Sequence, residues 1–185
     1  LRSLIVEREP IYRQQETVHG FADGLFGVDA QEMTHVCDDR LGRALDRLFD
    51  ADRAALLTEV VLAVGQRFGV SFDELHNDST SISFCGSYRG ASGRTIRGRS
   101  APVITYGHSK AHRPDLKQLL FILTVNTDGN IPVAFRCTDG NVSDSRTHIE
   151  TWNALRAVAG RADFLYVGDS KLCSRENMDY ITSVR

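Results

Sequence analysis

The chain has 185 residues, of which 42% are hydrophobic and 25% are charged, with a net charge of −2. This is the composition of an ordinary globular domain, long enough to build its core without disulfide staples. No apolar run approaches the roughly 20 residues of a membrane span, and we expect no signal peptide. The four cysteines lack zinc or redox spacing, which predicts a reducing, cytoplasmic compartment; they are Cys37, Cys85, Cys137 and Cys173.

The charge is distributed unevenly along the chain. Between Gly86 and Lys117 lie seven basic residues and one acid, Asp115, so this basic segment carries +6. Because the whole chain carries −2, the remainder carries −8. A basic segment on an acidic chain favours contact with a polyanion; the alternative is a solvated loop. The seven basic residues are Arg89, Arg94, Arg97, Arg99, Lys110, Arg113 and Lys117.

The first 69 residues are predicted to form a mainly helical region. Residues 1–37 show little periodicity, so we expect irregular structure with short helical pieces. Residues 38–50 and 52–69 each place apolar side chains on one helical face. We expect Asp38 or Asp39 to cap the first helix and Asp52 the second, with Gly69 at the end. A packed helical hairpin is favoured over a DNA-recognition helix.

From residue 70 the pattern becomes typical of strands. Residues 72–77 predict one strand, continued near residues 81–84. A glycine-rich basic loop is expected over residues 89–100. The nearly all-apolar stretch 119–125 predicts a strong strand, and the turn at Asp128 and Gly129 pairs it with a third strand in 131–141.

The last part of the chain predicts a crossover. Residues 143–160 form an amphipathic helix that Asp144 can cap, residues 164–167 a buried strand, and Ser174 caps a further helix. A strand that follows a crossover helix lies parallel to the strand it joins. Residues 70–185 therefore predict an α/β fold whose mixed sheet has three antiparallel strands and a parallel fourth.

This topology brings two carboxylates together. Asp78 is expected just past the first strand and Asp169 just past the fourth, at the same edge of the sheet. Neighbouring carboxylates raise each other's pKa or recruit a cation. Mg²⁺ prefers such oxygen ligands, and two ions about 4 Å apart suit phosphodiester chemistry. The alternative for Asp169 is a purely structural role as a turn former or helix cap.

Four sequence blocks resemble successive blocks of bacterial insertion-sequence transposases. They are "LHNDSTSISFCG", "TYGHSKAHRPDLKQLLFIL", "CTDGNVSDSRTH" and "YVGDSKLCSRENMDYI". The segment "DDRLGRALDRLFDAD" also resembles the region that precedes their core, and together, in the expected order, the resemblance spans most of residues 38–182. The class is the DDE transposases, in the branch of the IS-four-like superfamily, and the chain resembles its N-terminal and central part.

The resemblance implies a ribonuclease-H-like core, incomplete at its C-terminus, in which Asp78 and Asp169 are the first and second catalytic, metal-binding aspartates. It implies Mg²⁺, with Mn²⁺ as a substitute. The implied partner is DNA, both insertion-sequence ends and target, with a homodimer in the complete enzyme. The implied location is the bacterial cytoplasm, with nucleoid association when DNA is bound.

The third acid of that family is a glutamate on a helix well downstream, and nothing in the sequence matches it. Glu176 lies seven residues past Asp169, in a first helical turn, where the helix dipole already favours an acid. We do not expect it to be the third ligand, and we expect the chain to end before that residue. Two functions follow: part of a strand-cleaving and strand-transferring transposase, or a catalytically dead remnant that at most binds DNA.

Other patterns are weaker. The spacing of His108 and His112 would suit zinc on a helix, but the neighbouring glycine and proline predict a loop. These histidines and the seven basic residues are therefore expected to contact the phosphate backbone. Asp144 and Lys171 are candidates for supporting the metal ligands. An aspartate-dependent phosphatase would place a second acid where Thr80 stands.

Overall fold

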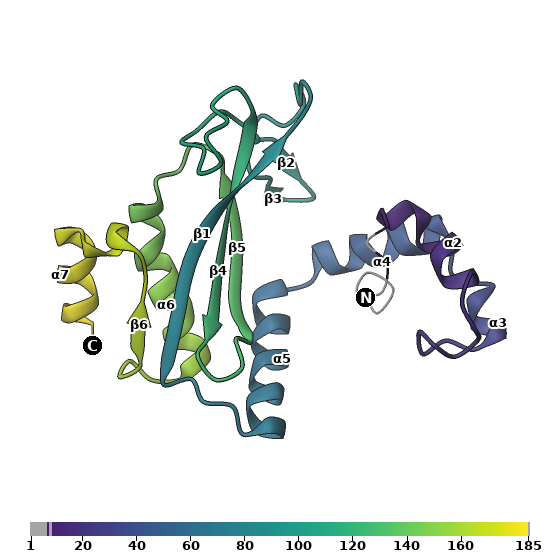
Figure 1. Ribbon diagram of the computed structural model, residues 1–185, viewed down its shortest axis with the longest axis horizontal. Helices are drawn as coiled ribbons and strands as arrows, with labels where there is room; N and C mark the ends of the chain where they lie inside the picture. Colours follow the sequence, from purple (N-terminus) through teal and green to yellow (C-terminus); the bar gives the residue numbers. More distant parts are fainter. Residues whose placement is uncertain (1–6, 8, 185) are drawn as a thin grey trace. The chain divides into compact units, whose positions relative to one another are not determined.

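The computed structural model describes residue 7 and residues 9–184 (Figure 1). The chain divides into two compact units, Leu1–Arg53 and Ala54–Arg185. Nearly all of α5 (Arg53–Phe68) therefore belongs with the sheet, whereas the sequence groups it with the N-terminal helices. Within the described residues, no helix combines the length and apolarity that crossing a bilayer requires.

The first unit is built from short helices, as the sequence predicts for the described part of residues 1–37; residues 1–6 and 8 lie outside the described residues. Its α4 begins after Cys37, which makes no side-chain capping bond. The prediction that Asp38 or Asp39 is the N-cap is wrong, because both lie in the first turn, where the helix dipole favours acids. The elements are η1 (Ile11–Arg13), α2 (Gln14–His19), α3 (Ala30–Met33) and α4 (Asp38–Asp50).

The apolar stripe of α4 is not covered. The helix buries none of its residues, and Leu45 and Leu48 are each 45% exposed. In α5, by contrast, Val61 is only 2% exposed and joins the core beneath the sheet. Gly69 ends α5 with a φ of +65°, as predicted. The packed hairpin of these two helices spans both units and stays a prediction.

A four-stranded mixed sheet dominates the second unit (Figure 1). Its order is β5-β4-β1-β6, in which β4 pairs antiparallel with β1 and β5, and β6 lies parallel to β1. This is the mixed sheet of three antiparallel strands and a parallel fourth that the sequence predicts. The strands are β1 (Glu74–Phe84), β4 (Lys117–Asn126), β5 (Pro132–Asp139) and β6 (Leu165–Val167).

The first strand runs without a break from Glu74 to Phe84, so its predicted continuation is present, but the prediction that Asp78 lies just past its end is wrong. Asp78 lies inside β1, where it is paired with Leu123 of β4. The ladder runs unbroken from Leu75 to Phe84. The polar middle of β1 has a low strand propensity of its own. Pairing with the strongly apolar β4 keeps it in the strand conformation.

The glycine-rich loop contains an unpredicted small hairpin of β2 (Thr95–Ile96) and β3 (Arg99–Ser100). Its two turn residues, Arg97 and Gly98, have φ values of +50° and +78°. Positive φ at both central residues is the geometry of a tight two-residue hairpin turn.

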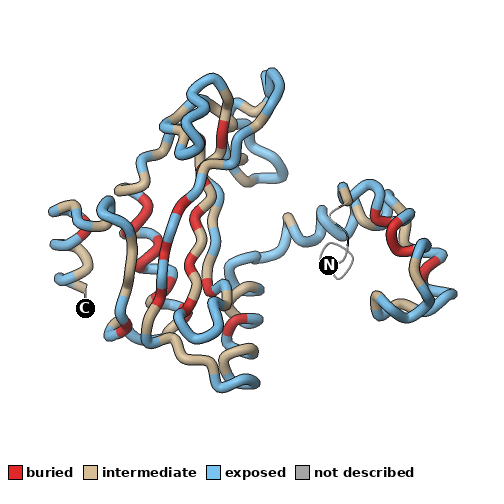
Figure 2. Tube along the Cα trace, in the orientation of Figure 1, coloured by how far each residue is buried: buried red, intermediate tan, exposed pale blue. Residues whose placement is uncertain are grey.

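Among the described residues, the crossover helix contributes three of the seven buried side chains of the core cluster. η2 (Asp144–Thr147) leads into α6 (His148–Ala159), whose Trp152, Leu155 and Val158 are buried. They form one cluster with Val61, Leu75, Val133 and Phe164. Figure 2 shows the buried stretches on the strands of the sheet and on α6. Burying each such side chain stabilises the folded state by about 1.5–3 kcal/mol. Because these side chains pack against the sheet, they hold the crossover helix in place and so position β6 beside β1.

Two short helices follow β6. They are η3 (Ser170–Cys173) and α7 (Arg175–Ser183). Ser174 caps α7 by accepting a hydrogen bond from the backbone N–H of Asn177, as the sequence predicts. Gly160, with φ +68°, ends α6, also as predicted.

Candidate active site

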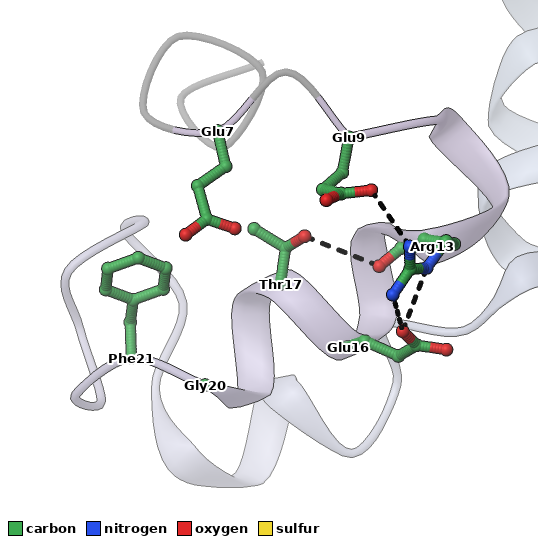
Figure 3. Close-up of a pocket in the computed structure, with 7 residues that line it drawn as sticks. All are labelled: Glu7, Glu9, Arg13, Glu16, Thr17, Gly20 and Phe21. Atoms are coloured by element: carbon green, nitrogen blue, oxygen red, sulfur yellow. Dashed lines mark hydrogen bonds and ion pairs between the residues drawn. The ribbon is translucent and has the colours of Figure 1, made fainter.

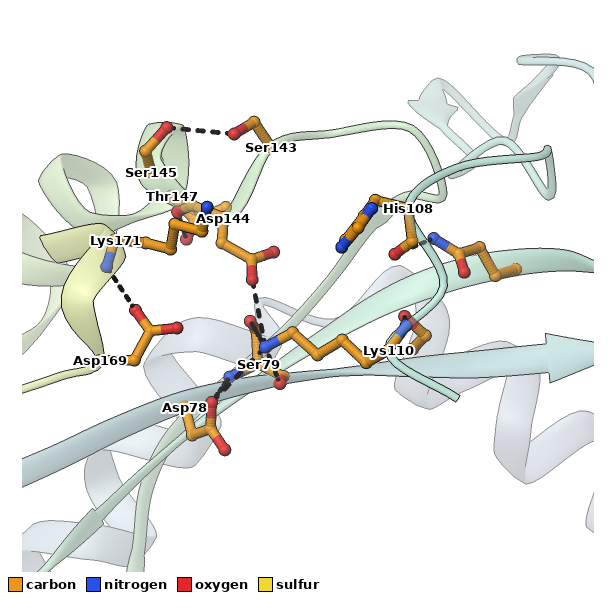
Figure 4. Close-up of polar contacts among 12 residues, drawn as sticks. Asp78, Ser79, His108, Lys110, Ser143, Asp144, Ser145, Thr147, Asp169 and Lys171 are labelled. Carbon is orange, nitrogen blue, oxygen red and sulfur yellow. Dashed lines mark hydrogen bonds and ion pairs between the residues drawn. The ribbon is translucent and has the colours of Figure 1, made fainter. Parts of the chain in front are cut away.

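Asp78 and Asp169 meet at the end of the parallel strand pair. The ladder between β1 and β6 ends with His76 opposite Val167. Each aspartate lies two residues beyond this last pair, so continuing the register sets them level with each other. Both line one small pocket, with Asn77, Ser79, Thr147 and His148. Figure 4 shows the two aspartates among their polar neighbours. The predicted juxtaposition is present, although Asp78 reaches it from within a strand.

The carboxylate of Asp78 is open to solvent. Its Oδ1 accepts a hydrogen bond of 2.7 Å from the backbone N–H of Ser79 and lies 3.6 Å from Lys110 Nζ. The side chain is 82% exposed. Among the described residues, Oδ2 has no hydrogen-bond or ion-pair partner, so this oxygen is available to a cation.

Asp169 has a structural role as well. Its Oδ1 accepts a hydrogen bond of 2.9 Å from the backbone N–H of Lys171 and caps η3. Lys171 thus contacts Asp169 through its own backbone N–H. Capping uses one carboxylate oxygen, and within the described part of the chain the other has no protein partner. The capping interpretation is correct, and it leaves an oxygen for a ligand.

Lys110 reaches into this site from the loop that precedes β4 (Figure 4). Its Nζ lies 2.6 Å from the carbonyl oxygen of Ser79, 2.8 Å from the Ser79 hydroxyl and 3.1 Å from Asp144 Oδ2. Asp144 is the first residue of η2 and makes this ion pair; the cap of α6 is Thr147, with no side-chain capping bond. The prediction that Asp144 caps the helix is therefore wrong.

Close backbone packing brings Lys110 and Asp144 together. A Cβ added to Gly107 would lie 1.8 Å from the carbonyl oxygen of Gly140, and one added to Gly140 would lie 2.0 Å from the carbonyl oxygen of Gln118. The Gln118 side chain also donates a 2.7 Å hydrogen bond to the Gly140 carbonyl. Only glycine permits this approach of the two loops.

His148 is a pocket residue that the sequence analysis missed. Its Nδ1 lies 2.9 Å from the hydroxyl of Tyr166. Burial lowers the pKa of His148, and the nearby carboxylates of Asp169 and Asp144 only partly oppose this. The imidazole is therefore expected to be neutral at pH 7. In the sequence, only its position near the start of an amphipathic helix could have indicated His148. Many residues with a purely structural role share such a position.

Gly168 makes room for this histidine. A Cβ at Gly168 would lie 3.3 Å from His148 Cε1 and 3.4 Å from the Leu172 side chain. Both contacts are tighter than most real Cβ contacts. A glycine before Asp169 thus lets β6 turn beside the pocket without crowding it.

The rest of the basic segment lies outside this pocket. Arg113 forms an exposed ion pair with Asp115 at 2.7 Å, and Lys117 donates to the carbonyl of Ser87 at 2.6 Å. His108 contributes a backbone carbonyl that accepts from Gln118, and His112 has a left-handed φ of +55° in a loop, as predicted. The exposed basic side chains around the β2–β3 hairpin are Arg89, Arg94 and Arg97, with Arg99 half-buried.

No third ligand is found with the two aspartates. Across residue 7 and residues 9–184, no group of three or more histidine, cysteine, aspartate or glutamate side chains is arranged to hold a metal ion. Glu176 lies exposed in the first turn of α7.

A second pocket lies in the first unit (Figure 3). Arg13 pairs there with Glu9 at 3.3 Å and with Glu16 at 3.0 Å. This pocket has no residues in common with the aspartate site. Its lining residues are Glu7, Glu9, Arg13, Glu16, Thr17, Gly20 and Phe21.

No protein-family model and no curated protein matches the sequence. Two solved structures match the structure of this chain. They are a Mos1 transposase paired-end complex with the left transposon end, at a TM-score of 0.38, and a pre-cleavage Mos1 transpososome, at a TM-score of 0.37. Both are 10% identical in sequence, and the match covers 98% of this chain and 54% of theirs. The chain thus spans about half the length of the transposase chains it matches. A similarity at this level concerns the backbone trace alone. Any proposal of function therefore rests on the residues of the pocket.

Proposed function

We propose that the pocket between β1 and β6 is part of a metal-dependent phosphodiester-cleaving site, and that the chain is part of a DNA transposase of an insertion sequence. One observation carries this proposal. Asp78 and Asp169, 91 positions apart, line the same pocket, and each keeps a carboxylate oxygen without a partner among the described residues. Like charges so placed are unfavourable unless a cation joins them.

The two aspartates fit Mg²⁺, with Mn²⁺ as a substitute, because hard divalent ions take carboxylate oxygens and keep positions open for phosphate oxygens. Asp78 and Asp169 would hold such an ion, which would supply Lewis-acid activation of the attacking oxygen and charge stabilisation of the leaving oxygen. The chain's own part is to hold one carboxylate within β1 and the other just beyond β6, at the cap of η3. The buried neutral His148 forms the inner wall of the pocket, and Gly168 leaves that wall uncrowded.

DNA is the substrate that the surroundings favour. The segment from Gly86 to Lys117 carries +6, and its Arg89, Arg94 and Arg97 lie exposed on and near the β2–β3 hairpin. Such side chains bind phosphates without regard to base sequence. The proposed substrates are the ends of the insertion sequence and its target DNA, for a homodimeric enzyme in a bacterial cytoplasm.

A catalytically dead, DNA-binding remnant is the second candidate. The absence of a third metal-ligating side chain beside the two aspartates, among the described residues, favours it. The two candidates differ in their response to divalent metal, because a remnant need not keep the metal site.

Titration with Mn²⁺ followed by electron paramagnetic resonance tests the proposal. The wild type is expected to bind Mn²⁺, and Asp78→Asn and Asp169→Asn are each expected to lose this binding. Asp163→Asn is the matched control, because Asp163 is exposed and its carboxylate pairs with Arg161 at 3.1 Å. Equal Mn²⁺ binding by the wild type and both site variants would contradict the metal site.

A further inference from the structure

The Lys110 ammonium occupies a cation position made entirely of oxygens. A backbone carbonyl, a hydroxyl and two carboxylates surround it, at 2.6, 2.8, 3.1 and 3.6 Å. Carbonyl, hydroxyl and carboxylate oxygens are also what hard divalent ions select. We propose that Lys110 is a built-in cation that competes with the divalent metal ion for Asp78, an inference that rests on the proposed function.

The distances show which partner is open to competition. An ammonium has three N–H donors, and Ser79 and Asp144 supply the three oxygens within hydrogen-bonding distance. Asp78 is the fourth and most distant oxygen, and its attraction to Lys110 is electrostatic. A metal ion can therefore approach the Asp78 carboxylate from the side away from Lys110. The ammonium stays bound to Ser79 and Asp144 and repels the metal ion.

The loop keeps this positive charge in place. The backbone N–H of Lys110 donates to the Ser81 hydroxyl at 3.3 Å. Five residues before Lys110, the bridge between Thr105 and Gln118 ties the same loop to β4. Gly107 is packed against the Gly140 carbonyl. Lys110 thus lies beside β1 at the level of the site, with its side chain only 32% exposed.

Neutralising Lys110 should tighten metal binding. Removing a unit positive charge about 4 Å from the bound carboxylate relieves a repulsion that solvent screens in part, since Asp78 is 82% exposed. We expect the Kd for Mn²⁺ to fall roughly tenfold in Lys110→Met, which corresponds to about 1.4 kcal/mol. Lys110→Arg keeps the charge, so its Kd should stay near the wild-type value.

The matched control is Lys117→Met. It removes the same charge from the same basic segment, but Lys117 donates to the Ser87 carbonyl and pairs with neither site carboxylate. Its Mn²⁺ Kd should equal that of the wild type. The measurement is again a Mn²⁺ titration by electron paramagnetic resonance without DNA, with a thermal melt of each variant to verify folding. Lys110→Gln replaces the methionine variant if that variant does not fold.

The outcomes separate this inference from the proposed function. Wild-type binding that Lys110→Met leaves unchanged overturns the competition and keeps the metal site. A lower melting temperature without tighter Mn²⁺ binding shows that Lys110 only anchors its loop, and it also overturns the inference. No Mn²⁺ binding by any variant overturns both proposals. Binding that is tighter in Lys110→Met and unchanged in Lys110→Arg and Lys117→Met supports the competition.

Discussion

Asp169 both caps η3 and lines the candidate metal pocket, so a pair of substitutions can separate its two roles. Its Oδ1 accepts the Lys171 backbone N–H at 2.9 Å. Asparagine keeps an oxygen for this bond but removes the charge, whereas alanine removes both. We expect both variants to lose metal-induced stabilisation and only Asp169→Ala to lose the cap.

The magnitudes follow from these contacts. Replacing an N-cap aspartate by alanine costs about 1 kcal/mol, and asparagine caps as well as aspartate. For a chain of this length, 1 kcal/mol corresponds to about 2–4 °C in Tm. Without metal, Asp169→Ala should therefore melt about 2–4 °C below the wild type, and Asp169→Asn should melt near it or slightly above, because the repulsion with Asp78 is relieved.

Added Mn²⁺ should increase the difference in Tm between the wild type and the two Asp169 variants. At a Mn²⁺ concentration a hundredfold above Kd, a ligand that binds only the folded state stabilises it by about 2.7 kcal/mol. The wild-type Tm should then rise by about 5–10 °C, and neither variant should follow. Thermal melts by circular dichroism, in EDTA and in Mn²⁺, measure both effects. An Asp169→Asn protein that keeps the full metal-induced rise would refute the ligand role and leave the cap alone.

Three further predictions concern DNA, catalysis and pH. Neutralising Arg94, Arg97 and Arg99 together should weaken binding to all DNA sequences alike and flatten the salt dependence by about 0.9 per lost phosphate contact; an unchanged slope in filter binding would exclude this role. This chain alone should not nick DNA in Mg²⁺ or Mn²⁺, and nicking that disappears in Glu176→Gln would identify Glu176 as the missing acid. Because burial lowers the pKa of His148, the unfolded chain binds its proton more readily, so this histidine's contribution to stability is present above about pH 6.5 and is lost as pH falls below it. Urea unfolding should therefore show a smaller loss at low pH for His148→Gln, and equal pH profiles would contradict the assignment.

Much of the fold is determined by local patterns. The apolar run from Leu119 to Val125, the turn at Asp128 and Gly129, and the helical spacing of Trp152 and Leu155 each follow from one short stretch. Together with the handedness of crossovers, these signals fix the strand order. The meeting of Asp78 and Asp169 follows from the same rules, because strands that run parallel end at the same edge of a sheet.

The remaining features depend on contacts between distant segments. β1 continues through Asp78 because β4 pairs with its whole length, which its own residues do not indicate. Lys110, one of seven basic residues in the segment from Gly86 to Lys117, becomes the cation beside Asp78 because Gly107 and Gly140 allow two loops to cross at backbone contact. That crossing also turns Asp144 from an expected helix cap into an ion-pair partner. The sequence by itself determined the sheet and its two aspartates, since hydrophobic periodicity and turn chemistry act locally; only the tertiary structure decided which charges surround them, since that depends on how closely remote backbones pack.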